Sequence, residues 1–301
     1  MATPARQRRS MRARFEDRLF QWAINAARRS AGFVTRRIGG GPDRIVYLER
    51  PGEAEPIVLL HGFAANKDNW LQFVRGLPRH YRIISFDLPG HGDSGFSADY
   101  DYRPTVLAQR IVAAVDILGL DRFHIAGNSL GGWVSTLIAA DGPGRILSLG
   151  LIDAAGVFPP IQSDLQRMLE DGQNPLLVSD RAGFDVLMDM VFYRRPPMPW
   201  PIPQALTRMA QNHYERNTKI FDDMYSNLVE TIDLLPDLDM PTLVIWGAKD
   251  RILHVSSTEI FDAHLPHSEV IVMPNCGHCP ILERAREAVF HYRSWLEATG
   301  V

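Results

Sequence analysis

The hydrophobic residues of the chain follow two alternating patterns over most of its length. Short apolar runs rich in β-branched residues are typical of buried strands. They fall at Arg44–Glu49, Ile57–Leu60, Arg82–Asp87, Phe123–Ala126, Leu147–Ile152, Thr242–Trp246 and Glu269–Met273. Longer stretches between several of them have apolar residues at helical spacing. These stretches predict helices at Thr105–Leu118, Leu130–Ala140 and Arg284–Leu296.

Together these elements predict an α/β fold. Apolar strands of about four to six residues, separated by helices, are typical of a mostly parallel sheet that is covered on both faces. Right-handed crossovers between successive strands then give a doubly wound sheet. This sheet would form a core made of two parts, residues 41–156 and residues 240–301.

The alternation breaks between residues 157 and 239, where we find no convincing strand. This segment contains the proline-rich run Pro196–Pro203 and six of the ten methionines of the chain. We interpret it as a helical cap over the carboxyl edge of the sheet, where the ligand clefts of open α/β sheets lie. The methionines would either line a pocket for a flexible acyl chain or fill the core of the cap itself.

A basic arm, residues 1–40, precedes the sheet. Its first 37 residues hold ten arginines and two acidic residues, a net charge of +8 in a chain whose total is −3. Apolar side chains recur there at helical spacing, from Phe15 through Leu19 and Trp22. The pattern is typical of an amphipathic helix on an anionic membrane surface. It also fits a helix that packs on the body with its arginines in water, or an organelle transit peptide.

Composition and charge indicate which classes of protein are expected. The 301 residues are 46% hydrophobic and 22% charged, which is typical of a globular protein with a full-sized core. Since no run approaches 18 apolar residues, we expect no membrane-spanning helix and no secretory signal. We expect a cytoplasmic protein, with peripheral membrane contact through the arm as one option. The net charge argues against a nucleic-acid partner.

The segment Gly127-Asn128-Ser129-Leu130-Gly131 lies where a predicted strand gives way to a predicted helix. It fits the pattern G-x-S-x-G, in which a sharp turn exposes a nucleophilic serine above the sheet edge. Glycine stands on either side because larger side chains would collide with the neighbouring backbone. The alternative is a glycine-rich turn with an incidental serine, which the strand and helix around it disfavour.

A serine nucleophile needs a base that is held by an acid. In this type of site the chain order is serine, acid, histidine. Asp250 follows the predicted strand Thr242–Trp246, and His278 follows the predicted strand Glu269–Met273. Both residues are therefore expected at the same edge of the sheet as Ser129.

Five segments carry a resemblance to a known family. They are LLHGFAANKDNW (Leu59–Trp70), DLPGHGDS (Asp87–Ser94), GNSLGG (Gly127–Gly132), IWGAKDRI (Ile245–Ile252) and NCGHCP (Asn275–Pro280). From about residue 40 onward the chain resembles the α/β-hydrolases, and within them the monoacylglycerol lipase and carboxylesterase branch. The motifs are specific for the fold and the triad, and much less so for the substrate.

The resemblance implies a role for each candidate residue. Ser129 would be the nucleophile, His278 the general base, and Asp250 the acid that orients the imidazole. The backbone N–H groups of Phe63 and Leu130 would form the oxyanion hole. The expected substrate is a small acyl ester, split through an acyl-enzyme without a cofactor or a metal.

Several residues compete for these roles. Asp153 follows the strand Leu147–Ile152 and is a rival for the acid, because some α/β-hydrolases place it there. The Gly-x-Lys-Asp sequence before Asp250 favours the latter. Gly92–Gly95 (GDSG) resembles a protease nucleophile loop, but its order in the chain is wrong. We assign structural roles to His61, His91 and His124.

The chain has two cysteines, Cys276 and Cys279, on either side of the candidate base. A structural zinc site needs about four ligands, and a redox pair normally opens a helix in a thioredoxin-like fold. Neither condition is met, so we expect both cysteines to be small buried residues. Their nearness to His278 leaves sensitivity to thiol reagents as a weaker hypothesis.

Three functions compete at this stage. The first is a serine hydrolase of lipid-like esters such as monoacylglycerols. The second is a C–C bond hydrolase of aromatic ring-cleavage products, which uses a similar Asn-Ser-x-Gly-Gly turn. Those enzymes usually carry further glycine and proline after the His-Gly pair, whereas Phe63–Lys67 (FAANK) stands here. The third is a non-catalytic binder, which would be expected to lack a member of the triad.

Overall fold

A computed structural model describes residues 10–226 and 230–300. It contains one eight-stranded sheet in the order β1-β2-β4-β3-β5-β6-β7-β8. Strand β2 runs antiparallel to both of its neighbours, and all other neighbouring strands are parallel. The expected mostly parallel α/β sheet is therefore confirmed. The strands are β1 (Val34–Ile38), β2 (Ile45–Arg50), β3 (Ala54–Leu60), β4 (Tyr81–Phe86), β5 (Phe123–Asn128), β6 (Ile146–Ile152), β7 (Thr242–Gly247) and β8 (Ser268–Met273).

Each of the seven apolar runs forms one of these strands, and β1 is the strand that the hydrophobic pattern missed. Its sequence, VTRRI, carries two arginines, and four of its five residues are exposed. An exposed edge strand has no apolar face to bury, so no period-2 pattern marks it. Residues 34–38, which were expected to belong to the basic arm 1–40, thus join the sheet.

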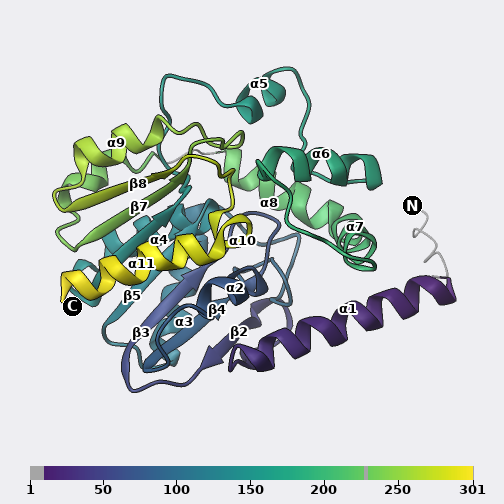
Figure 1. The fold of residues 1–301 in the computed structure, drawn as a ribbon, viewed down its shortest axis with the longest axis horizontal. Coiled ribbons are helices and arrows are strands. Elements are labelled where there is room, and N and C mark those ends of the chain that lie inside the picture. The colour runs from purple at the N-terminus through teal and green to yellow at the C-terminus, as the bar shows by residue number, and fades with distance from the viewer. Residues whose placement is uncertain (1–9, 227–229, 301) are drawn as a thin grey trace.

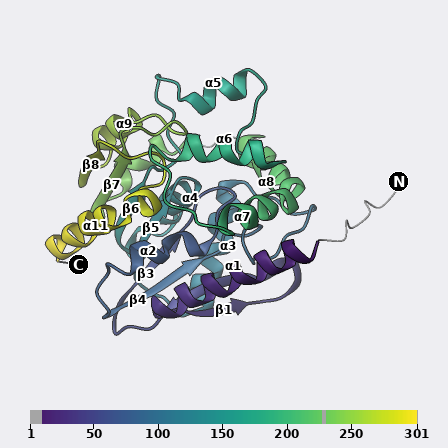
Figure 2. The same cartoon turned by 45° about the vertical axis from the view of Figure 1, so that its right-hand side comes forward.

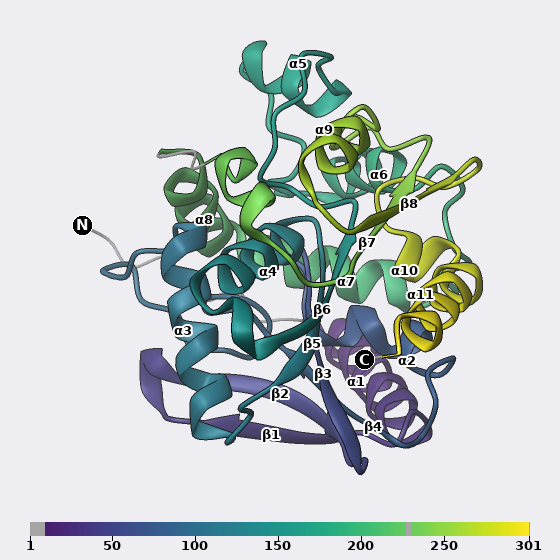
Figure 3. The same ribbon diagram turned by 90° about the vertical axis from the view of Figure 1, so that its left-hand side faces the viewer.

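Helices cover both faces of the sheet (Figure 3). The α-helices are α1 (Met11–Ser30), α2 (Leu71–Val74), α3 (Pro104–Ile117), α4 (Leu130–Asp141), α5 (Asp164–Glu170), α6 (Arg181–Val191), α7 (Ile202–Asn212), α8 (Tyr214–Ser226), α9 (Ser257–His264), α10 (Pro280–Glu283) and α11 (Ala285–Thr299). Short 3-10 helices are η1 (Gly41–Asp43), η2 (Lys67–Trp70), η3 (Pro143–Arg145) and η4 (Ile232–Asp237). Three of these helices, α3, α4 and α11, lie where helical spacing predicts them.

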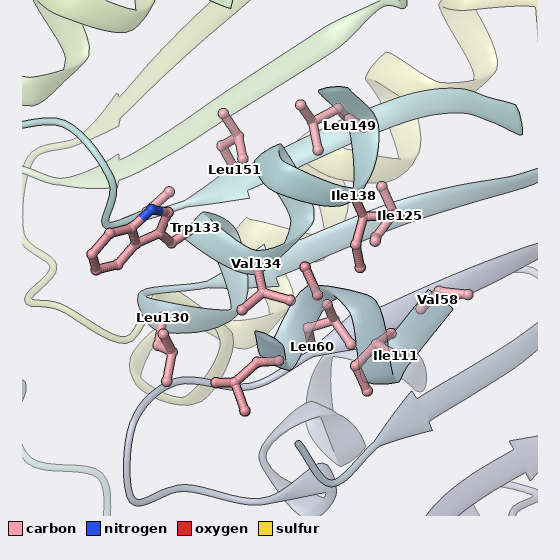
Figure 4. Packing of buried hydrophobic residues seen from close by; sticks show 14 of the residues in the cluster. Val58, Leu60, Ile111, Ile125, Leu130, Trp133, Val134, Ile138, Leu149 and Leu151 are labelled. Atoms are coloured by element: carbon pink, nitrogen blue, oxygen red, sulfur yellow. The ribbon is translucent and has the colours of Figure 1, made fainter. Parts of the chain in front are cut away.

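Alternate residues of each central strand enter two different hydrophobic cores. On one face Val58 and Leu60 of β3 pack with Ile125 of β5 against α3 and α4 (Figure 4). On the other face Ile57 and Leu59 pack against α2, α11 and the chain that follows α1. Because both faces are buried, the strands read as continuous apolar runs. The two cores fix the positions of the strand ends that carry the candidate site.

Helices α5, α6, α7 and α8 lie between β6 and β7 in the chain and stand beyond one end of the sheet (Figure 1). They contact loops at the carboxyl ends of the strands. The ring of Phe63, after β3, lies 5.8 Å from that of Phe221 in α8. The backbone N–H of His278 donates to the carbonyl of Val191 at the end of α6, at 2.8 Å. The cap therefore touches the segments that hold the candidate residues.

Helix α1 packs against α7 of the cap (Figure 2). Its buried residue is Glu16, which pairs with Arg208 of α7 at 2.8 Å. Near its other end, Arg28 binds Asp68 of η2 through two hydrogen bonds of 2.6 and 2.7 Å. Helix α1 is thus fastened to the cap and to the core, with much of its outer face exposed.

Candidate active site

Ser129 occupies the turn between β5 and α4, with φ 57° and ψ −121°. Three non-glycine residues of the described chain have positive φ, and Ser129 is one of them. Such a conformation costs on the order of 1–3 kcal/mol and persists where the surrounding structure enforces it. The turn leaves the serine side chain at the first turn of α4, where free backbone N–H groups favour negative charge.

The flanking glycines are required by close backbone approach. A Cβ on Gly127 would lie 2.1 Å from the carbonyl oxygen of Gly131. A Cβ on Gly131 would lie 2.2 Å from the carbonyl oxygen of Leu60 in β3. Both contacts are with backbone, which cannot move aside as a flexible side chain could. The spacing of the two glycines therefore follows from how β5, β3 and α4 meet.

Asp250 and His278 meet at the ends of β7 and β8. The His278 Nδ1 lies 2.7 Å from Asp250 Oδ2, and both side chains are almost fully buried. Asp250 Oδ1 accepts from the backbone N–H groups of Ile252 and Leu253, at 2.7 and 3.0 Å. A carboxylate on Nδ1 fixes the proton there, so that Nε2 is the ring nitrogen left to accept a proton.

The same edge brings His278 next to the serine turn. Asn128, directly before Ser129, donates from its side-chain amide to the His278 carbonyl oxygen at 3.3 Å and to that of Ile152 at 3.0 Å. Asn128 therefore ties the loop after β8 to the ends of β5 and β6. This role of Asn128 was not predicted from the sequence, although its place directly before the serine could have suggested it.

The loop after β3 lies on the other side of Ser129. A Cβ on Gly62 would lie 3.1 Å from the Ser129 Cβ and 3.5 Å from its Oγ. In the described part of the chain, the backbone N–H groups of Phe63 and Leu130 donate to no other protein group. Two unused donors near a serine hydroxyl are what an oxyanion hole requires.

His61 shapes this loop from within the core. It is fully buried, and its Nε2 accepts from the backbone N–H of Leu88 at 3.0 Å. Its Nδ1 lies 2.7 Å from the Gly62 carbonyl oxygen. Burial holds the pKa of His61 well below its ordinary value. The ring is thus a neutral structural group that fixes the loop after β3.

Asp153 lies next to the histidine–aspartate pair without bonding to the imidazole. Its Oδ1 accepts from the backbone N–H of Gly247 at 2.9 Å. Among the described residues, no donor faces its buried Oδ2, and its ligand atoms lie within 4.8 Å of those of Asp250 and His278. Burial, and then the Asp250 carboxylate, raise the pKa of Asp153 well above its ordinary value. A protonated Asp153 can donate to Asp250 and leave Asp250 as the ionised partner of the imidazole.

The GDSG segment and the two cysteines lie in surroundings that give them structural roles. In the GDSG segment, Ser94 donates to the carbonyl oxygen of Asp87 at 2.9 Å, and Asp93 binds Lys67 at 2.7 Å. Both Cys276 and Cys279 are buried free thiols. Burial raises the pKa of both thiols, so neither is a ready thiolate nucleophile.

The methionines of the cap fall mostly in hydrophobic cores. Met190 and Met224 are buried, and Met168 and Met188 pack against buried clusters. These four favour the simpler of the two interpretations, in which methionine fills the interior of the cap and its junction with the sheet.

Comparison with known proteins gives consistent matches. The family model described as the alpha/beta hydrolase family matches residues 57–291. Lipase 3 of Moraxella sp. (strain TA144) is 32% identical over 259 residues, which are 84% of this chain and 81% of that protein. A monoacylglycerol lipase of Xenopus laevis, abhd6-B, is 32% identical over 288 residues, 90% of this chain and 83% of that protein.

Among solved structures, the crystal structure of a membrane phospholipase A, described as a bacterial virulence factor, superposes with a TM-score of 0.90. The two chains are 37% identical, and the match covers 94% of this chain and 92% of the other. The likeness therefore extends over the sheet and the cap together.

Proposed function

This chain belongs to the alpha/beta hydrolase family, and from that premise we propose that it hydrolyses carboxylic esters of lipid-like molecules through a serine nucleophile. The observation that carries the proposal is the 2.7 Å contact between His278 Nδ1 and Asp250 Oδ2, held beside the strained turn of Ser129. Relatives that are lipases and monoacylglycerol lipases support lipid esters as the substrate class.

The proposed mechanism has two acyl-transfer steps. Nε2 of His278 takes the proton of Ser129 as Oγ bonds to the acyl carbon, and the Phe63 and Leu130 N–H groups stabilise the oxyanion. His278 then gives that proton to the departing alcohol, and the acyl group stays on Ser129. A water molecule, deprotonated in turn by His278, releases the carboxylic acid and restores the hydroxyl. Asp250 stabilises the imidazolium during both steps.

Replacing the nucleophile tests this proposal. Ser129→Ala should lower the turnover of a p-nitrophenyl ester by about 10⁶-fold, because the three groups act as a unit. Ser94→Ala, in the GDSG segment, is the matched control and should stay active while its melting temperature reports any loss of packing. Retention of most activity by Ser129→Ala would overturn the assignment.

The substrate class has its own test. A series of p-nitrophenyl esters and monoacylglycerols with increasing acyl length should show turnover on lipid-like chains. A ring-opened dienoate, whose yellow colour fades on C–C cleavage, should persist in the presence of the enzyme. Faster bleaching of the dienoate than hydrolysis of any ester would favour the C–C hydrolase instead.

We also propose that the outer face of α1 contacts a lipid surface. Met11, Phe15 and Trp22 are 88%, 59% and 64% exposed, and at 3.6 residues per turn they lie within about 40° of one another. The exposed Arg14 and Arg18 lie beside this apolar stripe, and the exposed Arg29 continues it near the end of α1. Aromatic residues beside arginines are typical of helices that lie in the interface of an anionic membrane.

Trp200 of the cap adds to this surface, since its ring lies 6.3 Å from that of Phe15 and is half exposed. No described helix is long and apolar enough to span a bilayer. We propose a cytoplasmic location with membrane contact through the α1 stripe.

Point substitutions test this contact better than removal of residues 1–37, because removal would also delete most of β1. Phe15→Gln with Trp22→Gln should weaken sedimentation with phosphatidylglycerol vesicles by at least about tenfold, since two apolar side chains lose their burial. Phe290→Gln, an exposed phenylalanine on α11, is the matched control. Equal vesicle binding by all three proteins would contradict the proposal.

A further inference from the structure

One hollow of the described structure has none of the serine-turn residues in its lining. It is bounded by β1 and β2, by the segment after β4 and by the first turn of α8, and its volume is about 670 Å³. Four arginines line it, namely Arg36, Arg37, Arg44 and Arg216, and we call it the arginine hollow. Its floor, Gly92–Ser94, directly follows His91, whose ring packs edge-on against those of His61 and Phe63. His91 thus lies between this hollow and the loop after β3.

The positive charge of the arginine hollow is largely uncompensated. Arg36 pairs with Glu49 at 2.5 Å. In residues 10–226 and 230–300, no carboxylate lies within ion-pair distance of Arg37, Arg44 or Arg216. Arg44 Nε instead donates to the backbone carbonyl of Asp93 at 3.0 Å, and Arg216 to that of Gly92 at 3.3 Å.

The single acid in the lining, Asp93, also contacts two cations outside the hollow. Its Oδ2 lies 2.7 Å from the buried Lys67 ammonium and 4.0 Å from the Arg28 guanidinium. Although burial opposes ionisation, Lys67, then Arg28 and Arg44, hold the pKa of Asp93 below its ordinary value. Asp93 therefore offsets part of the positive charge, but four arginines face this one carboxylate in the lining of the hollow.

Arg216 is the residue that most needs a partner. Its side chain is largely desolvated, and burial lowers its pKa. Its Nε is buried without a hydrogen-bond acceptor among the described residues. A buried guanidinium donor without an acceptor costs free energy. Because Arg216 also lines the hollow, an anion there would lie beside a guanidinium that has no carboxylate partner.

We propose that the arginine hollow is a binding site for a phosphate group. Guanidinium forks match the oxygens of phosphate, and charge-assisted hydrogen bonds of this kind are about twice as strong as neutral ones. Arg37 and Arg44 would bind from the strand side and Arg216 from the cap side. The phosphate comes either from the headgroup of an anionic phospholipid or from a free phosphoryl compound. This site does not depend on the proposed hydrolase activity.

The test compares two charge-matched double variants of the full chain. Arg37→Gln with Arg44→Gln removes two hollow arginines, and Arg122→Gln with Arg286→Gln removes two exposed arginines elsewhere. Inorganic phosphate, titrated against chloride at equal ionic strength, should raise the melting temperature of the wild type and of the control. The hollow variant should bind phosphate at least about tenfold more weakly, because charge-assisted bonds are lost.

Vesicles identify the source of the phosphate. If the hollow variant also binds phosphatidylglycerol vesicles more weakly than the control does, the ligand is a lipid headgroup. If only the titration with phosphate changes, the ligand is a soluble phosphoryl compound. Equal responses of the wild type to phosphate and chloride, or equal phosphate affinities of the two double variants, would overturn the proposal.

Discussion

Two carboxyl groups lie beside the imidazole of His278, and they have different environments. Asp250 accepts from two backbone N–H groups and from the imidazole. Asp153 accepts from one backbone N–H and is otherwise enclosed beside Asp250. The arrangement gives one group the role of ionised partner and the other that of a neutral hydrogen-bond donor that positions it.

This difference predicts opposite results for the same substitution. Asp250→Asn should lower ester turnover by about 10⁴-fold, because the amide favours the wrong imidazole tautomer. Asp153→Asn should stay within about tenfold of the wild type, because an amide can still accept from Gly247 and donate to Asp250. Turnover numbers of both variants on a p-nitrophenyl ester provide the measurement. The reverse order would make Asp153 the acid.

The buried His124 leads to a prediction about how the stability of the protein depends on pH. It is buried in β5, its Nδ1 lies 2.8 Å from the Ser148 hydroxyl, and burial lowers its pKa to about 4. Because the unfolded pKa is about 6.5, the folded state binds fewer protons between these values. The resulting stability is present above pH ~6.5 and is lost as the pH falls through about 4.

His124→Gln should therefore flatten the loss of stability between pH ~6.5 and 4. Urea unfolding of the wild type and the variant across this range is the measurement. Parallel stability curves for the two proteins would mean that His124 does not titrate as its burial implies.

At the scale of elements, the turn around Ser129 depends on glycines that face backbone. Gly131→Ala should destabilise the protein by about 3 kcal/mol or more, because its Cβ would lie 2.2 Å from the Leu60 carbonyl oxygen. Gly144→Ala is the control, since nothing lies within 4 Å of its Cβ position. Urea denaturation of both variants measures the difference, and equal stabilities would contradict this account of the motif.

The sequence predicted those elements in which the spacing of apolar residues reflects which side chains are buried. Six of the seven strands that were found bury several side chains, and β8 buries Met273 and half-buries Val270 and Ile271. In contrast, β1 is exposed and its VTRRI sequence shows no such pattern. The cap helices were expected only as a group. Their ends depend on local caps such as Asp180, whose side chain accepts from the Gly183 N–H, and on contacts with the sheet that a single sequence does not display.

The candidate residues of the site could be predicted from the sequence, but fewer of the contacts that join them could be. Ser129, Asp250 and His278 stand at strand ends, and a parallel sheet brings such ends together. The bridge from Asn128 to His278 and the placing of Asp153 against Asp250 arise from the loops between strands. Those contacts depend on three-dimensional packing, which neither spacing nor composition encodes.

At the scale of the whole molecule, α1 joins the cap to the core. Arg208 of α7 binds Glu16 at 2.8 Å and Asp17 at 2.6 Å, while Arg28 binds Asp68 at the far end of the helix. The helix that carries the proposed lipid-facing stripe is therefore held by ion pairs at two places along its length. Its orientation relative to the cap depends on a small number of ion pairs.

Breaking the cap-side pairs should loosen this helix. Arg208→Gln removes one guanidinium partner of the buried Glu16 carboxylate, which keeps Arg12 at 3.0 Å, and it also removes a partner of Asp17. Loss of a partner at a buried carboxylate is destabilising. We expect hydrogen exchange in the first half of α1 to become at least about tenfold faster, with the sheet unaffected. Arg181→Gln, which breaks an exposed pair with Asp185, is the control. Unchanged exchange in α1 would show that these pairs do not hold it.

Covalent trapping of the acyl-enzyme tests the central claim most directly. The protein is quenched in acid during turnover of a p-nitrophenyl ester, digested, and analysed by mass spectrometry. We predict an acyl adduct on Ser129, within the peptide that spans the turn between β5 and α4, and no adduct in Ser129→Ala. An adduct on any other residue, or one that persists in Ser129→Ala, would contradict the proposed chemistry.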